Sequence, residues 1–159
     1  MIERATIVAL ARGELATRYP GLRRTGTRWQ HQARTLGLAV DCVGLVGAVA
    51  LAAGVAEARA WFEDDDLKRY GRPPDPSVLL GAARRYMDEI AVADALPADV
   101  LVMASDRSPT VPTHFALVTQ ADPRYIIHAH AAARRVIEHR HDEGARWPVL
   151  RAFRFRGVA

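Results

Sequence analysis

The chain has 159 residues, half of them apolar, so it is long enough to form one domain, over residues 1–159, with a hydrophobic core. No apolar stretch reaches the roughly 20 residues that a membrane-spanning helix needs. The net charge of +4 comes from scattered arginines, with no basic run interleaved with aromatic residues, so a nucleic-acid partner is not expected. Because the acid at Glu3 precedes only a short apolar stretch, we expect no signal peptide.

The first 92 residues follow the 3.6-residue periodicity of helices in three segments. We predict helices over residues 2–17, 41–60 and 77–92, and an irregular polar segment over residues 22–40. The acidic run Glu63-Asp64-Asp65-Asp66 predicts a solvated turn, and the proline-rich segment 71–76 predicts a loop.

From residue 100 onward the pattern is that of strands. We predict them at residues 100–104, 114–119, 125–129, 134–138 and 150–155. Short turns such as Ala121-Asp122-Pro123 join these segments, which implies an antiparallel sheet. Helices followed by strands predict an α+β fold, with N-terminal helices packed on a C-terminal antiparallel sheet of about five strands.

The only cysteine lies at the start of the second predicted helix, in the sequence Asp41-Cys42-Val43-Gly44-Leu45. An acidic cap followed by a thiol and helix formers places the sulfur at a helix N-terminus. Free N–H groups and the helix dipole favour the thiolate there. The alternative is a buried, inert thiol, since free cysteines are usually buried. A single cysteine also excludes an internal disulfide framework.

Two histidines lie in strand-like settings, His114 in the second predicted strand and His128 near the end of the third. The midpoint between them is residue 121, close to the predicted turn, so the two imidazoles are expected to pair across the ladder. One can then take the proton from Cys42 while the other orients it, which is the arrangement of a papain-like thiol hydrolase. The remaining strand histidines are expected to be structural: His130, His139 and His141.

A metal site is the main chemical alternative. His128 and His130 are two residues apart in a strand, so they share a face and could bind Zn²⁺ together with His114 or Cys42. His139-Arg140-His141 offers a second such pair. However, the chain has no HExxH or CxxC spacing, and no acid occupies a matching strand position. We therefore expect neither a metal nor a cofactor.

In their order along the chain, several short motifs resemble those of the NlpC-type papain-like cell-wall peptidases. The resemblance extends over essentially the whole chain, and the closest variant is the form encoded in phage tail clusters and gene transfer agents. The motifs are Asp41-Cys42-Val43-Gly44-Leu45, Leu96-Pro97-Ala98-Asp99-Val100-Leu101, His114-Phe115-Ala116-Leu117-Val118 and Ile127-His128-Ala129, with support from residues 30–33, 134–139 and 152–155.

The resemblance implies Cys42 as nucleophile, His114 as base and His128 as the orienting residue. It also implies hydrolysis of amide bonds in peptidoglycan stem peptides, typically between D-γ-glutamate and diaminopimelate. Phage members act at the tail tip during DNA entry. The implied location is therefore a phage-like particle that acts at the bacterial cell wall, with tail-tip proteins as partners.

The chain departs from this family pattern ahead of the cysteine. Where the family often has a tyrosine that helps hold the oxyanion, this chain has Trp29-Gln30-His31, and Trp29 can donate only its indole N–H. We predict that Trp29, Gln30, His31 and Asp41 form the oxyanion or substrate-binding region. The substitutions also leave open a second function, a structural module of a phage-like tail tip with little or no catalysis.

Overall fold

The computed structural model describes residues 1–16, 26–72, 74–142 and 146–159. Helices come first along the chain: α1 (Arg4–Gly13), α2 (Cys42–Ala53), α3 (Ala58–Glu63), α4 (Asp65–Arg69) and α5 (Pro76–Tyr86). The longer strands follow: β4 (Met87–Ile90), β5 (Val100–Ser105), β6 (Ser108–Gln120), β7 (Tyr125–His130), β8 (Arg135–Arg140) and β9 (Val149–Phe155), with a 3-10 turn η1 (Val92–Asp94) after β4. The α+β class is confirmed.

One sheet organises the molecule, with strand order β2-β3-β1-β8-β7-β6-β5-β9-β4. The described sheet has nine strands where about five were predicted. The additional ones are β4 and three two-residue strands inside the segment predicted to be irregular: β1 (Arg28–Trp29), β2 (Arg34–Thr35) and β3 (Ala39–Val40). All five predicted strands are present, and β6 starts six residues earlier than expected, at Ser108.

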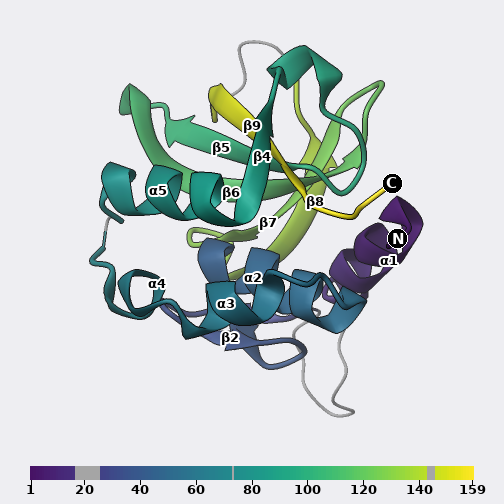
Figure 1. Cartoon of the computed structure of the whole chain (residues 1–159). Helices are drawn as coiled ribbons and strands as arrows, with labels where there is room; N and C mark the ends of the chain where they lie inside the picture. The colour runs from purple at the N-terminus through teal and green to yellow at the C-terminus, as the bar shows by residue number, and fades with distance from the viewer. Residues whose placement is uncertain (17–25, 73, 143–145) are drawn as a thin grey trace.

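Helix α2 is the centre of the core on one side of the sheet. Every residue from Cys42 to Ala50 is buried, because the helix is apolar all round and packs against α1, α3, β6 and β7. Figure 1 shows α2, α3 and α4 gathered on this side of the sheet, with the two chain ends close together. The N-terminal end of α2 is thereby directed at the strands that carry His114 and His128. Within the described residues, no helix is both long and apolar enough to cross a bilayer.

All three predicted helices are shorter in the structure. The helix predicted to reach residue 60 ends at Ala53, because Gly54 adopts a left-handed conformation with φ +83° and closes the helix. The helix predicted over 77–92 ends at Tyr86, and Met87 to Ile90 pair with β9 instead. Pairing with an available sheet edge outweighs a helical pattern of this length. The first helix, predicted over 2–17, spans Arg4–Gly13, and residue 17 itself lies outside the described residues.

The acidic run is not simply a solvated turn. Asp64 is 8% exposed and caps α4 by accepting from the N–H of Asp66 at 2.9 Å. It also accepts hydrogen bonds from Arg85 and from the Tyr86 hydroxyl, the latter at 2.7 Å. The run therefore contributes a buried cap and an ion pair that tie α4 to α5.

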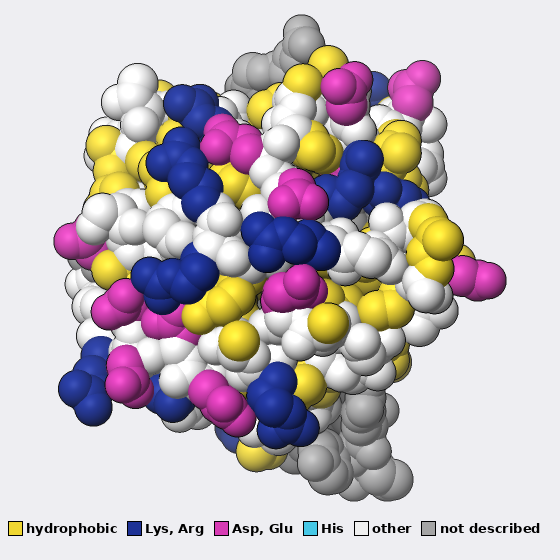
Figure 2. Space-filling view, in the orientation of Figure 1, with side chains coloured by type: hydrophobic (Ala, Val, Ile, Leu, Met, Phe, Trp, Pro, Cys, Tyr) yellow, Lys and Arg dark blue, Asp and Glu magenta, His cyan; other side chains and the backbone are white. Residues whose placement is uncertain are grey.

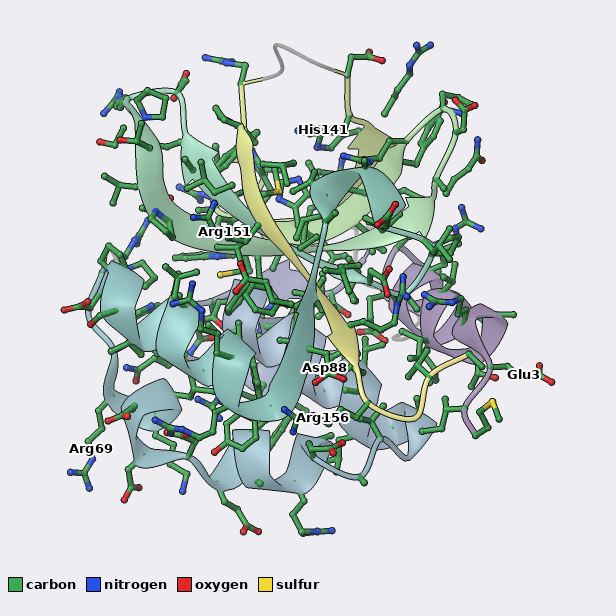
Figure 3. All side chains as sticks on the ribbon, turned by 45° about the horizontal axis from the view of Figure 1, so that its top comes forward. Glu3, Arg69, Asp88, His141, Arg151 and Arg156 are labelled. Atoms are coloured by element: carbon green, nitrogen blue, oxygen red, sulfur yellow. The ribbon has the colours of Figure 1, made fainter. Side chains whose placement is uncertain are left out.

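Basic and acidic side chains alternate on the face shown in Figure 2 and do not form a patch of one sign. One such pair lies where β4 and β9 meet: Arg156 Nε is 3.0 Å from Asp88 Oδ1, and the two side chains are labelled in Figure 3. On this face the arginines pair with neighbouring carboxylates, which agrees with the scattered charge in the sequence.

Candidate active site

Asp41 and Gly44 hold the start of α2 in place. Asp41 has extended backbone geometry, and its Oδ1 accepts from the Gly44 N–H at 2.9 Å, which is an N-cap. Its Oδ2 accepts from the Gln32 N–H at 2.6 Å. A Cβ on Gly44 would lie 2.0 Å from the carbonyl oxygen of Ala33, so only glycine permits this approach. The Asp-Cys-Val-Gly sequence therefore anchors the helix end that carries the thiol.

The Cys42 thiol is protonated in the resting site. Burial, and then the negative charge of Asp41, raises the pKa of the thiol to about 12. Hydrogen bonds from the backbone N–H groups of Phe115, Val43 and Cys42 act in the opposite direction but are outweighed. The prediction that the helix N-terminus yields a resting thiolate is therefore wrong, because desolvation of the charged form exceeds the stabilisation by the helix end. The contact with Phe115 also places the sulfur beside the residue that follows His114.

His114 and His128 are in direct hydrogen-bond contact, with 2.7 Å between His114 Nε2 and His128 Nδ1. The contact is diagonal, however, and not directly across the ladder as predicted. The register pairs Leu117 with Ile127, which puts His128 opposite Ala116 when it is continued. Residues two apart on a strand share a face, so both imidazoles lie on the same side of the sheet.

Both histidines are neutral at physiological pH. Burial, and then the proximity of His130, lowers the pKa of His114 to about 3. Burial, and then the neighbouring histidines led by His114, lowers the pKa of His128 to about 2. A neutral imidazole has one free lone pair and can accept a proton, which is the state that a general base needs.

Cys42 and His114 line one pocket of about 500 Å³. Its wall is mainly aromatic and apolar, and the remaining lining residues include Trp29, His31, Asp41, Tyr70, Arg72, Ala129 and Trp147. A concave, largely apolar site with a few converging polar groups is the usual form of a small-molecule or peptide-binding site. His128 lies behind His114 and is fully buried.

The residues predicted from the sequence do not all reach this pocket. Trp29, His31 and Asp41 line it, and His31 Nδ1 is 3.8 Å from Asp41 Oδ2. Gln30 is absent from the lining: its N–H donates to the carbonyl of Val40, and its own carbonyl accepts from Ala33. Gln30 therefore supports the short strands ahead of α2 through its backbone.

The lining residues that were not predicted include Tyr70, Arg72 and Trp147. The Tyr70 hydroxyl donates to Asp41 Oδ2, and burial followed by the Asp41 charge raises the pKa of this phenol. The guanidinium of Arg72 lies 4.5 Å above the Trp29 ring. The Trp147 ring is 4.9 Å from that of His114. These residues come from connecting segments far from Cys42 in sequence, and no local pattern marks them.

The histidine contacts bear on the metal alternative. Both ring nitrogens of His128 are already engaged, Nδ1 with His114 and Nε2 with His139 at 3.0 Å. His130 Nδ1 accepts from the Ala133 N–H at 2.9 Å. Across the described residues, no three or more histidine, cysteine or acidic side chains are grouped so that they could hold a metal ion.

No family model matches the sequence, and no curated protein is significantly similar to it. Solved structures do match. NlpC2 from Trichomonas vaginalis has a TM-score of 0.60 and 16% identity over 94% of this chain. The NlpC/p60 domain of the peptidoglycan hydrolase SagA has a TM-score of 0.58 and 17% identity, and the match covers 96% of this chain and 98% of that domain. The chain has the NlpC/p60 fold.

A third match has the same fold. NlpC1 from Trichomonas vaginalis has a TM-score of 0.59 and 15% identity over 94% of this chain. This chain spans 44% of the NlpC2 chain and 42% of the NlpC1 chain, so it corresponds to one part of each of those proteins. At these identities the similarity establishes the NlpC/p60 fold, and the fold agrees with the resemblance found in the sequence motifs.

Proposed function

We propose that this chain is a cysteine hydrolase that cleaves amide bonds in peptidoglycan stem peptides. The observation that carries the proposal is the shared pocket: the Cys42 thiol at the start of α2 and the His114 imidazole, hydrogen-bonded to His128, line the same cavity. The NlpC/p60 fold supports the substrate class, because the similar SagA domain belongs to a peptidoglycan hydrolase. Cys42 is the nucleophile, His114 the general base and His128 the orienting residue.

Attack on the substrate begins from a neutral pair. As the Cys42 sulfur bonds to the carbonyl carbon, its proton passes to His114, and the carbonyl oxygen becomes an oxyanion. The backbone N–H groups of Cys42 and Val43 lie at the N-terminal end of α2, beside the sulfur. They can donate hydrogen bonds to the oxyanion there. Because both groups are neutral at rest, proton transfer accompanies the attack and does not precede it.

Collapse of the tetrahedral adduct breaks the C–N bond, and His114 gives its proton to the departing amine. The acyl group remains on Cys42 as a thioester. Water then attacks the thioester carbonyl and loses a proton to His114. The C–S bond breaks, the thiol takes back the proton, and a carboxylic acid is released, so atoms and charge balance.

The bond that is cleaved and the location of the protein are inferred from the sequence motifs. These motifs support a D-γ-glutamyl-diaminopimelate endopeptidase that is carried by a phage-like tail, has tail-tip proteins as partners and opens the cell wall locally. The aromatic pocket walls are compatible with a peptide substrate, since apolar and aromatic surfaces bind the chain while a few polar groups orient it.

The decisive experiment incubates the purified chain with intact peptidoglycan and identifies released fragments by mass spectrometry. We expect fragments that end at D-glutamate from the wild type and none from Cys42→Ala, whose melting temperature should confirm that it is folded. Because Cys42 is the only cysteine, iodoacetamide provides a matched chemical control on the unmutated chain. No release from any wall type, together with stable incorporation into tail particles, would support the structural module instead.

A further inference from the structure

A chain of hydrogen bonds continues beyond the His114–His128 pair to a third histidine. His128 Nε2 is 3.0 Å from His139 Nε2, and His139 Nδ1 is 2.8 Å from the carbonyl oxygen of Arg140. The three imidazoles lie on three neighbouring strands, β6, β7 and β8. His139 does not line the pocket, so any effect of His139 on the reaction acts through His128.

The carbonyl at the end of this chain determines where each proton lies. A carbonyl oxygen can only accept, so a neutral His139 carries its proton on Nδ1 and has a free lone pair on Nε2. His128 must then donate from Nε2, which leaves its Nδ1 as an acceptor. His114 must in turn donate from Nε2. The remaining ring nitrogen of His114, Nδ1, therefore carries the lone pair that can accept the Cys42 proton.

We propose that His139 is a positioning residue that sets the tautomers of His128 and His114, so that His114 presents an unprotonated Nδ1 to the thiol. This inference rests on the proposed function for the role of Cys42. A side chain at this position that could only donate would reverse the order of donors and acceptors: His128 would accept at Nε2 and carry its proton on Nδ1. His114 Nδ1 would then be protonated and unable to act as a base.

The surroundings of His128 favour its neutral form. The neighbouring groups that act on it are all cationic when charged: His114 on β6, His130 on β7, His139 on β8, and His141 after β8. The last hydrogen-bond partner in the series is the carbonyl oxygen of Arg140, which fixes the position of the His139 proton without itself taking a proton. In this arrangement orientation is supplied by a neutral hydrogen-bond chain, whereas a carboxylate would stabilise an imidazolium.

Three substitutions at His139 separate the donor and acceptor roles of its side chain. His139→Gln keeps an acceptor for His128 Nε2 and should retain most activity. His139→Leu removes it and should lower kcat by roughly 10- to 100-fold with KM unchanged. His139→Lys offers only donors, which reverses the chain, and should lower kcat on the order of 1000-fold.

His130→Asn is the matched control. The His130 ring lies 5.3 Å from that of His128, compared with 5.1 Å for His139, but His130 is outside the hydrogen-bond chain. Asparagine preserves the acceptor that His130 Nδ1 offers to the Ala133 N–H. This variant should keep the kcat of the wild type.

Tautomers can also be observed without any substrate. Long-range ¹H–¹⁵N spectra of the histidine rings should show the proton on Nε2 of His128 and His114 in the wild type, and on Nδ1 of both in His139→Lys. A wild-type His128 that carries its proton on Nδ1, or a His139→Leu variant with wild-type kcat, would overturn the inference. If the wild type cleaves no peptidoglycan, the proposed function fails, and the spectra still decide the proton positions.

Discussion

The hydroxyl of Tyr70 donates a hydrogen bond to the carboxylate of Asp41, the residue immediately before Cys42. Asp41 is 3% exposed and also receives N–H groups from Gln32 and Gly44. Tyr70 thus connects the segment after α4 to the cap of α2, and it lines the pocket at the same time. A buried carboxylate that loses one of its donors is costly, because the desolvated charge is left with less compensation.

We therefore expect Tyr70→Phe to lower the free energy of unfolding by about 1–3 kcal/mol in urea titrations. It should also reduce hydrolase activity, because the start of α2 is less firmly held. Tyr86→Phe is the matched control: it removes a hydroxyl that donates to Asp64 at 2.7 Å, away from the pocket. It should lower stability comparably and leave kcat unchanged. Equal losses of kcat in both variants would contradict a local role for Tyr70.

The second prediction concerns the reactivity of Cys42. Because burial raises the pKa of the thiol to about 12, alkylation by iodoacetamide should be slow at pH 7 and accelerate about tenfold per pH unit up to that pKa. In urea the same cysteine should titrate near the ordinary value of about 8.5. A fast, pH-independent rate below pH 8 in the folded chain would show a resting thiolate paired with His114 and contradict the neutral resting state.

The third prediction concerns acid stability. The folded-state pKa values of His114 and His128, about 3 and about 2, lie below the unfolded value of about 6.5. Between these values the unfolded chain binds protons that the folded chain does not, so stability falls as pH decreases from about 6.5 toward 3. Each histidine contributes a slope of about 1.4 kcal/mol per pH unit.

Urea unfolding at several pH values measures this slope. His128→Asn removes one of the two titrating groups, so its slope should be smaller by about 1.4 kcal/mol per pH unit than that of the wild type. An identical slope for the variant would mean that His128 is protonated in the folded chain.

The fourth prediction concerns substrate recognition by Arg72. Among the described lining residues it is the one lysine or arginine, and its guanidinium is held over the Trp29 ring. A free carboxylate on the substrate is the natural partner for this cation. Arg72→Ala should raise KM by roughly 10-fold for peptides with a free carboxylate and have little effect on amidated ones. Arg69→Ala, an exposed arginine on α4 outside the pocket lining, is the control (Figure 3).

The fifth prediction concerns metals. His128 has no ring nitrogen left for a metal, so activity should survive dialysis against EDTA, and metal analysis of the active protein should find no stoichiometric zinc. Loss of activity in EDTA that Zn²⁺ restores would instead support a site built from His114, His128 and His130.

Local patterns in the sequence were sufficient for the fold class and for the expectation that His114 and His128 meet. Apolar periodicity marked the helices and strands, and the Asp-Cys-Val-Gly sequence marked a capped helix start, because capping and close approach depend on neighbouring residues. Strand position and the turn near Asp122 brought His114 and His128 to adjacent strands, although the register made the contact diagonal.

What the sequence could not determine depends on contacts between distant segments. The helix predicted over 77–92 gave way to β4 because β9, some 65 residues later, offers an edge to pair with. The thiol is neutral because α2 is buried on all sides, and burial is a property of the packed molecule. Tyr70 and Arg72 join the pocket from the segment between α4 and α5, and Trp147 joins it from the segment between β8 and β9. His139, expected to be merely structural, meets His128 only because β7 and β8 are adjacent, and that adjacency places the protons of the site.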